Sequence, residues 1–221
     1  MKNITKGVRR FQTEVFPHQK SAYESMARRQ QRPMAVFVAC SDSRVMPTEF
    51  TQTEPGDLFF VRNAGNIIPP HGAPAGGEAA TIEYAVRVLG IRQIIVCGHS
   101  QCGAMQAIVD TPEQLESLPS VRAWLHHADA TRQIVNHKYP DLHGEERLVA
   151  AIEENVLVQI NNLSTHPSIA MLLATGELKV FGWYFDIATG MVHHYNPETR
   201  MFEELDEDHE SVSPIPLREH L

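Results

Sequence analysis

Apolar and polar positions alternate along the chain in blocks that predict strands and helices in turn. Short, continuous apolar runs are typical of strands buried on both faces of a parallel sheet. Three such runs occur, at residues 34–39, 58–61 and 94–97. Helical spacing of apolar residues recurs over 79–89, 119–139 and 144–164, and from His166 onward. Residues 178–185 and 191–195 predict a late hairpin. Strands alternating with helices predict an α/β fold with a mostly parallel central sheet flanked by helices.

The first thirty residues predict a helical arm that precedes this domain. The apolar residues of its first helix share one face: Ile4, Val8, Phe11 and Val15. We expect Pro17 to end that helix and a second short helix to follow near residues 22–26. The arm either folds on its own apolar residues or packs on a partner subunit, and the extent of its apolar face favours the partner. We therefore predict an arm at 1–30 and one α/β domain at 31–221.

Composition narrows the class of protein. A chain of 221 residues with 43% apolar content can bury one large core, and a net charge of −8 argues against a nucleic-acid partner. The acidic run at 203–208 predicts a solvated tail. Three cysteines do not suggest a disulfide framework, and we find no signal peptide and no apolar run long enough to span a membrane. These features predict a cytoplasmic protein.

Two short segments each carry half of a candidate metal site. Segment 40–44 contains Cys40, Asp42 and Arg44, and segment 99–102 contains His99 and Cys102. Both follow a predicted buried strand, and sites in open α/β sheets form outside the carboxyl ends of the strands. Two thiolates, one imidazole and one carboxylate suit tetrahedral zinc, which activates water when the fourth ligand is dispensable.

The spacing inside each segment suggests how the ligands converge. In an extended stretch Cys40, Asp42 and Arg44 would point the same way. His99 and Cys102, three apart, would share one turn of a helix. Asp42 has two alternatives, since it can close the zinc site as a fourth ligand or pair with Arg44 and leave that position to water.

Simpler interpretations remain for several residues. Cys40 and Cys102 could be small buried hydrophobes, with His99 a hydrogen-bonded core histidine. Cys97 lies inside a predicted strand and is better explained as a packing thiol. Other histidines are expected at the surface or in packing: His126, His127, His193 and His194. Gly98 is expected to open a turn, and Gly65, Gly76 and Gly77 fit loop geometry because their spacing matches neither common phosphate-binding motif.

The two half-sites together resemble the signature of the β-class carbonic anhydrases. The resemblance extends over roughly residues 2–200 and is closest to bacterial enzymes of the cyanate-associated type. It rests on further segments: 55–57, 62–66, 82–85, 121–125, 154–156, 165–167 and 182–186.

This resemblance implies roles for individual residues. It implies zinc bound by Cys40, His99 and Cys102, with Asp42 and Arg44 as a catalytic dyad. Its implied substrate-pocket residues are Gln31, Phe59, Tyr84 and Gly103. It also implies a homo-oligomer, at least a dimer, with pockets built across the subunit interface.

One departure from the family concerns regulation. A subgroup with an inhibitory bicarbonate pocket carries tryptophan three residues before the first zinc cysteine and glycine one before it. This chain has Phe37 and Ala39 there, which favours the subgroup with an open site.

The resemblance implies a zinc lyase, a carbonate dehydratase, that reversibly hydrates carbon dioxide to bicarbonate and a proton. Two alternatives remain: a hydrolase of carbon disulfide or carbonyl sulfide with the same ligands, and a structural-zinc interaction protein without turnover.

Overall fold

The computed structural model describes residues 1–74, 76–205 and 212–216, and forms two compact units, Met1–Arg32 and Pro33–Leu221. The first unit is helical, with α1 (Lys2–Arg10), the π-helical η1 (Phe11–Val15) and α2 (Phe16–Arg28). The prediction that Pro17 ends the helix is wrong. Pro17 lies in the first turn of α2, where a missing N–H costs little, and the wider turn of η1 carries the helical path up to it.

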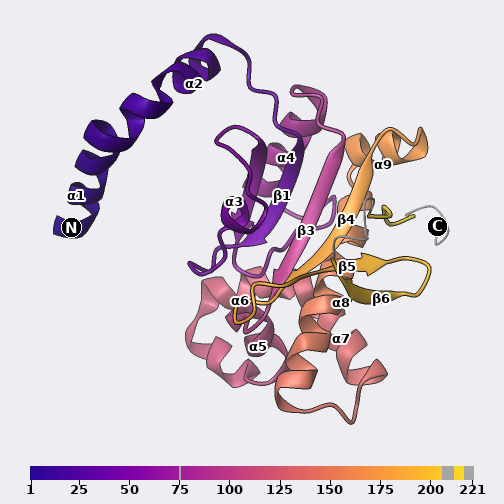
Figure 1. The fold of residues 1–221 in the computed structure, drawn as a ribbon. Helices are drawn as coiled ribbons and strands as arrows, with labels where there is room; N and C mark the ends of the chain where they lie inside the picture. Colours follow the sequence, from indigo (N-terminus) through magenta and orange to yellow (C-terminus); the bar gives the residue numbers. More distant parts are fainter. Residues whose placement is uncertain (75, 206–211, 217–221) are drawn as a thin grey trace. The chain divides into compact units, whose positions relative to one another are not determined.

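The second unit is built on a six-stranded sheet, which confirms the predicted α/β fold (Figure 1). The strand order is β2-β1-β3-β4-β5-β6, with parallel pairing up to β4 and antiparallel pairing beyond it. The strands are β1 (Ala35–Cys40), β2 (Leu58–Asn63), β3 (Gln93–His99), β4 (Lys179–Phe185), β5 (Val192–Asn196) and β6 (Met201–Glu204). The predicted late hairpin is β4 and β5.

Helices and short 3-10 turns connect these strands. They are α3 (Pro47–Phe50), α4 (Gly77–Arg87), α5 (Gly103–Val109), η2 (Pro112–Ser117), α6 (Pro119–Leu125), η3 (His126–Ala128), α7 (Asp129–Lys138), α8 (Gly144–Ser164) and α9 (Pro167–Ala174). The helical pattern at 119–139 is interrupted at η3, and α8 spans the predicted range 144–164. Periodicity did not reveal α3, α5 or β6, which are only four to seven residues long. Among the described residues, no helix is long and apolar enough to cross a membrane.

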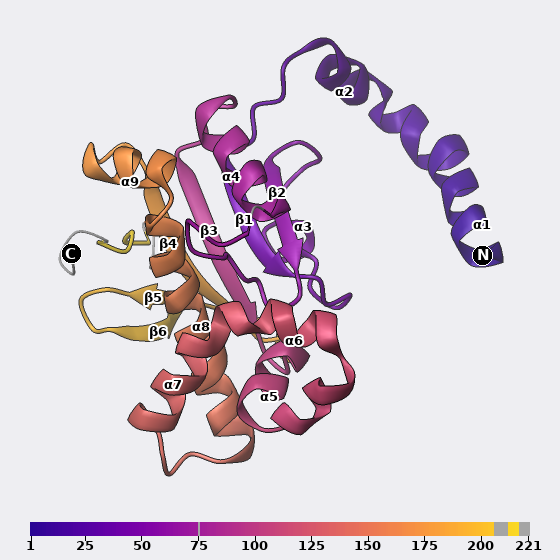
Figure 2. The ribbon, with the colours of Figure 1, turned by 180° about the vertical axis from the view of Figure 1, so that it is seen from behind.

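One face of the sheet is covered by α4, α8 and α9 through a cluster of branched aliphatic side chains (Figure 2). Gly98 lies inside β3 rather than opening a turn, so that expectation is wrong. A Cβ at Gly98 would lie 2.6 Å from the Ile152 side chain of α8, so glycine lets this helix approach the strand closely.

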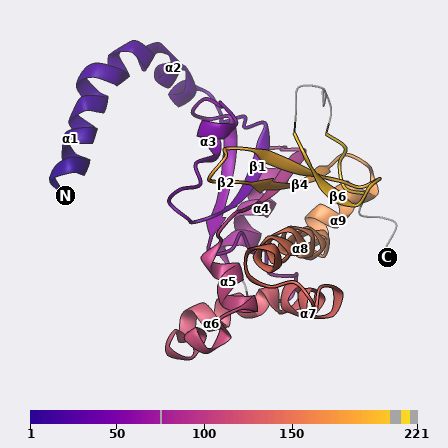
Figure 3. The same ribbon diagram turned by 60° about the horizontal axis from the view of Figure 1, so that its bottom comes forward.

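Helices α5, α6 and α7 gather with α8 near the carboxyl end of β3 (Figures 1 and 3). Their apolar residues, among them Met105 and Ile152, form a separate cluster together with Cys40 and Cys102. The site described below is therefore bounded by the sheet on one side and this helical cluster on the other.

The acidic run at 203–208 does not begin as a tail, although Glu204 is exposed as predicted. Glu203 and Glu204 belong to β6, and the Glu203 carboxylate accepts hydrogen bonds from Asn196 at 2.8 Å and Thr199 at 2.6 Å. Residues 206–208 lie outside the described residues.

Candidate metal centre

The site lies where the direction of the chain through the sheet changes. The connection leaving β1 leads to β2 on one side, whereas the connection leaving β3 leads to β4 on the other. Such a switch point leaves a crevice at the carboxyl ends of the two strands. Cys40 ends β1 and His99 ends β3, so sheet topology brings these two residues together.

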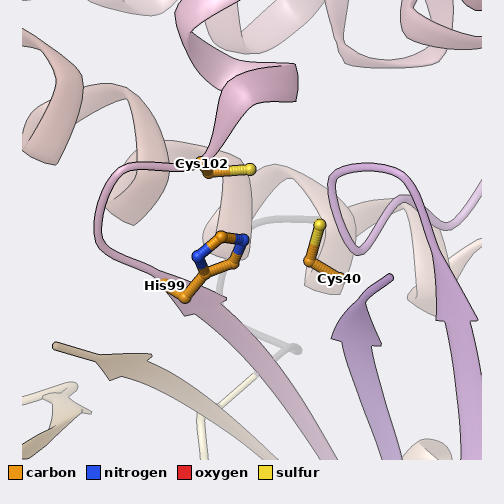
Figure 4. Close-up of side chains that lie close together, drawn as sticks. All are labelled: Cys40, His99 and Cys102. Atoms are coloured by element: carbon orange, nitrogen blue, oxygen red, sulfur yellow. The ribbon is translucent and has the colours of Figure 1, made fainter. Parts of the chain in front are cut away.

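The side chains of Cys40, His99 and Cys102 point toward one another (Figure 4). All three are buried, and their candidate ligand atoms lie within 4.8 Å of one another. His99 Nδ1 lies 2.9 Å from the Ser100 carbonyl, which fixes the proton on that nitrogen. Nε2 is then a buried lone pair without a hydrogen-bond partner in the part of the chain that the structure describes. A soft divalent metal ion with nitrogen and sulfur ligands fits this arrangement.

The thiols perturb one another's pKa in opposite directions. The pKa of Cys40 is lowered to about 4, chiefly because the Cys102 side chain hydrogen-bonds to it, with further help from the Gly65 N–H. The same contact and burial raise the pKa of Cys102. The pair therefore holds one negative charge readily and the second only with a cation beside it.

The local backbone differs from the two expectations based on residue spacing, a shared helical turn for His99 and Cys102 and an extended stretch at 40–44. His99 and Cys102 do not share a helical turn, because His99 ends a strand and Cys102 caps α5. Gln101, in the left-handed region at φ 57°, makes the sharp turn between them. Segment 41–44 is not extended either, since Asp42 Oδ1 accepts the Arg44 backbone N–H at 2.9 Å and turns the chain.

Asp42 and Arg44 are brought together by this turn. Arg44 Nε donates to Asp42 Oδ1 at 3.0 Å, and Nη2 donates to Oδ2 at 2.7 Å. The guanidinium hydrogen bonds hold the pKa of Asp42 well below its usual range. Arg44 Nη1 also donates to Gln101 Oε1 at 3.0 Å, which links the two ligand-bearing segments.

Arg62 is a supporting residue that sequence reasoning did not single out. Its guanidinium donates to three carbonyls of the loop after β1, those of Cys40 at 3.0 Å, Asp42 at 3.1 Å and Val45 at 2.8 Å. The available signal was a positively charged residue near the end of the predicted strand at 58–61, which could pair with the strand that ends at Cys40. Arg62 fixes the backbone on which Cys40 and Asp42 are carried.

The four expected pocket residues do not all gather around the ligands. Gly103 follows Cys102 directly as the first residue of α5. The rings of Phe59 and Tyr84 stack with centroids 6.2 Å apart. Phe59 pairs with Val36, four residues before Cys40, which places it about 13 Å along the sheet from the ligand edge. Gln31 is exposed in the first unit, after α2.

The remaining cysteine and histidines lie apart from the ligand cluster. Cys97 is buried among apolar side chains that include Phe37 and Ala39, its Sγ donates to the Gly98 carbonyl at 3.3 Å, and burial raises its pKa. His126 is exposed and contacts Asp129, whereas His194 is buried. In the described residues, one cluster of three or more histidine, cysteine, aspartate or glutamate side chains is close enough to share a metal ion. It consists of Cys40, His99 and Cys102.

Comparison with known proteins agrees with this chemistry. Residues 35–192 match the family described as carbonic anhydrase. The chain belongs to this family. A carbonic anhydrase of Pseudomonas aeruginosa is 46% identical over 207 residues, which is 94% of this chain and 93% of that protein. The solved β-carbonic anhydrase CcaA is 41% identical and superposes with a TM-score of 0.93, covering 99% of this chain and 96% of that one. A β-carbonic anhydrase of Sordaria macrospora, described as tetrameric, is 28% identical with a TM-score of 0.68, covering 87% of this chain and 92% of that one.

The predicted membership of the β class is confirmed. With it, the prediction that this chain is an enzyme is confirmed: it is a carbonic anhydrase, a lyase that interconverts carbon dioxide and bicarbonate.

Proposed function

We propose that Cys40, His99 and Cys102 bind one zinc ion and that this centre carries out the reversible hydration of carbon dioxide. The observation that carries the proposal is the buried His99 Nε2, which has no hydrogen-bond partner among the described residues and faces two thiols. Membership of the carbonic anhydrase family identifies the reaction that such a centre performs here.

Zinc, when bound, supplies a Lewis acid that makes water a nucleophile near neutral pH. Asp42 provides the orienting acceptor. Arg44 donates two hydrogen bonds to Oδ1 and one to Oδ2, which leaves a lone pair on Oδ2 to accept a hydrogen bond from the attacking water. Because its pKa is held low, Asp42 stays ionised across the working pH range. Gly103, next to Cys102, is exposed at the start of α5, and its backbone amide would be the donor toward which the oxygen of the substrate turns.

Metal analysis combined with stopped-flow kinetics tests this proposal. We expect about one zinc per chain and rapid hydration of carbon dioxide that a zinc chelator abolishes. The same preparation assayed with carbon disulfide and carbonyl sulfide separates the hydrolase alternative. Full zinc without turnover of any of these substrates would identify a structural-zinc protein instead.

We also propose that the protein works as a homo-oligomer, at least a dimer, in which Phe59 and Tyr84 serve the site of a neighbouring copy. Their distance from the ligand edge of their own chain supports this division. Gln31 and the arm at 1–30 belong to the same proposed interface, and the exposed apolar side chains of the arm support it. We place the enzyme in the cytoplasm, where its three free thiols stay reduced.

Mixed oligomers test whether the pocket is shared. Arg44→Ala and Tyr84→Ala subunits are expected to be poorly active separately. If Tyr84 serves a neighbouring site, a mixture assembled together contains intact sites and regains activity. If Tyr84 serves its own chain, each site in the mixture still carries one defect and activity stays low.

A further inference from the structure

One peptide group, between Ala64 and Gly65, joins the candidate metal centre to α6. Its N–H, on Gly65, donates to Cys40 Sγ at 3.3 Å. Its carbonyl, on Ala64, accepts the indole N–H of Trp124 at 2.8 Å. The tryptophan therefore acts on the far end of the same planar group whose near end contacts a candidate zinc ligand.

A hydrogen bond to the carbonyl of a peptide polarises its N–H. Linked hydrogen bonds strengthen one another in this way, and the effect is larger in the low dielectric of a buried site. The indole N–H contacts the carbonyl oxygen at the exposed end of the peptide, beside Ala64, whereas Gly65 and Cys40 at its other end are buried. Trp124 thereby fixes the orientation of the peptide and increases the donor strength of the Gly65 N–H.

The rest of Gly65 is held so that this peptide has little freedom to rotate. Its own carbonyl accepts the Asn155 side-chain amide at 3.0 Å. Its φ of +83° is one that glycine adopts readily, and a Cβ there would lie 3.1 Å from the Ala104 side chain of α5. Since α5 begins directly after Cys102, Gly65 lies between the two cysteine-bearing segments.

We propose that Trp124 is a positioning residue for the metal centre, acting on Cys40 through the Ala64–Gly65 peptide. Its indole N–H aims and strengthens the N–H···S hydrogen bond, which withdraws electron density from the sulfur and holds it toward His99 and Cys102. This inference rests on the proposed role of Cys40 as a zinc ligand. Groups that contact a ligand and not the metal, as the Gly65 N–H does, typically change metal affinity by about 10- to 100-fold when they are removed, and Trp124 acts through that group, so we expect the lower end of this range.

The chain offers a matched control for the loss of an indole N–H. Trp183 is the second of its two tryptophans, and its Nε1 has no hydrogen-bond partner among the described residues. Trp124→Phe and Trp183→Phe therefore make the same chemical change, but only the first removes a donor in use. The cobalt-substituted protein reports on the sulfur directly through its sulfur-to-cobalt charge-transfer band.

We expect Trp124→Phe to move this band to longer wavelength and to release zinc to a chelator about tenfold faster than the parent. Trp183→Phe should leave both unchanged. A role of Trp124 in packing alone would not shift the band, so equal band positions and release rates in Trp124→Phe and the parent overturn the inference.

A second variant covers the case in which Trp124→Phe does not fold. Trp124 is the remaining tryptophan in Trp183→Phe, and 5-fluorotryptophan incorporated there keeps the ring while making its N–H a stronger donor. The band should then move to shorter wavelength and zinc should leave more slowly, and an unchanged band contradicts the inference. A parent protein that binds neither zinc nor cobalt would instead defeat the proposed function.

Discussion

Arg44 holds both carboxylate oxygens of Asp42, two residues earlier in the chain, through a pair of hydrogen bonds at 3.0 and 2.7 Å. The same guanidinium reaches Gln101 in the second ligand-bearing segment. Asp42 is therefore engaged away from a metal ion by a cation that is itself anchored across the site. In the proposed zinc centre, this pair would decide whether the ion keeps an open fourth position.

Replacing Arg44 with alanine should release Asp42 to take the fourth position on zinc. We expect zinc to be retained in full while carbon dioxide hydration falls by at least about 100-fold, since an orienting acceptor is lost and the open position is filled. Arg44→Lys keeps the charge without the two-pronged geometry and should also be impaired. Metal analysis and stopped-flow kinetics on both variants check this, and hydration at the parent rate in Arg44→Ala would show that Arg44 has no gating role.

Cys102→Ser should lose zinc and stability, because an alcohol is a poor ligand and leaves Cys40 and His99 without a partner. Cys97→Ser makes the same change at a buried thiol outside the cluster, and its hydroxyl can still donate to the Gly98 carbonyl. We expect this control to keep its zinc. Elemental analysis of the two purified variants separates them, and a full zinc content in Cys102→Ser would remove Cys102 from the ligand set.

The sequence predicted the elements whose signals are local and strong. Continuous apolar runs marked β1 and β3, so Cys40 and His99 could be placed at strand ends that meet. The turns could not be predicted in the same way. Gln101 takes a left-handed conformation that its residue type does not demand, and Asp42 turns the chain through a side-chain bond to its own backbone. Arg62 and Trp124 act through carbonyls distant in sequence, which no spacing rule reveals.

Glu153 should make the protein less stable at alkaline pH. Its pKa is raised to about 7, first by burial and then by the neighbouring Glu154 carboxylate. Because the folded-state pKa lies above the unfolded value, its stabilising contribution is complete below about pH 4.5 and is lost as pH rises through about 7. Glu153→Gln should therefore be more stable than the parent at pH 8 by about 1–2 kcal/mol and little different at pH 5.

Thermal or urea unfolding at the two pH values measures this difference. Glu154→Gln is a control at the neighbouring residue, where we expect the substitution to lower stability rather than raise it. Glu154 Oε1 accepts from Lys138 Nζ at 2.7 Å and from the Tyr139 hydroxyl at 3.0 Å, so weakening that acceptor should destabilise the protein at both pH values. A Glu153→Gln variant with the same pH dependence as the parent would show that burial does not perturb this carboxyl.

Deleting residues 1–30 should weaken the assembly. Ile4, Val8, Phe11 and Val15 are exposed within the helical unit, with Ile4 at 67% and Val8 at 51%. Such side chains are covered in a working protein, and a neighbouring subunit would supply the cover. Sedimentation of the truncated chain should show smaller species or a lower melting temperature. Ile4→Ser with Val8→Ser tests the apolar face without shortening the chain. An unchanged assembly and stability in both variants would contradict the prediction that the arm packs on a neighbouring subunit.

Bicarbonate should not shut this enzyme down cooperatively. Phe37 and Ala39 stand where the inhibited subgroup has tryptophan and glycine, and both are fully buried. Phe37 packs edge-on against Trp183 with ring centroids 5.9 Å apart, so this position offers an apolar ring and no indole donor to an anion. Without a bound anion, less holds the site closed, so the Asp42–Arg44 pair should persist in crystals grown near pH 8.

Activity should rise smoothly with pH, following a single ionisation, and added bicarbonate should act only as product. Stopped-flow rates from pH 6 to 9, with and without bicarbonate, measure this in the parent and in Phe37→Trp with Ala39→Gly. A steep, cooperative profile with bicarbonate inhibition in the parent, or a crystal near pH 8 with Asp42 bound to zinc, would refute the open-site assignment.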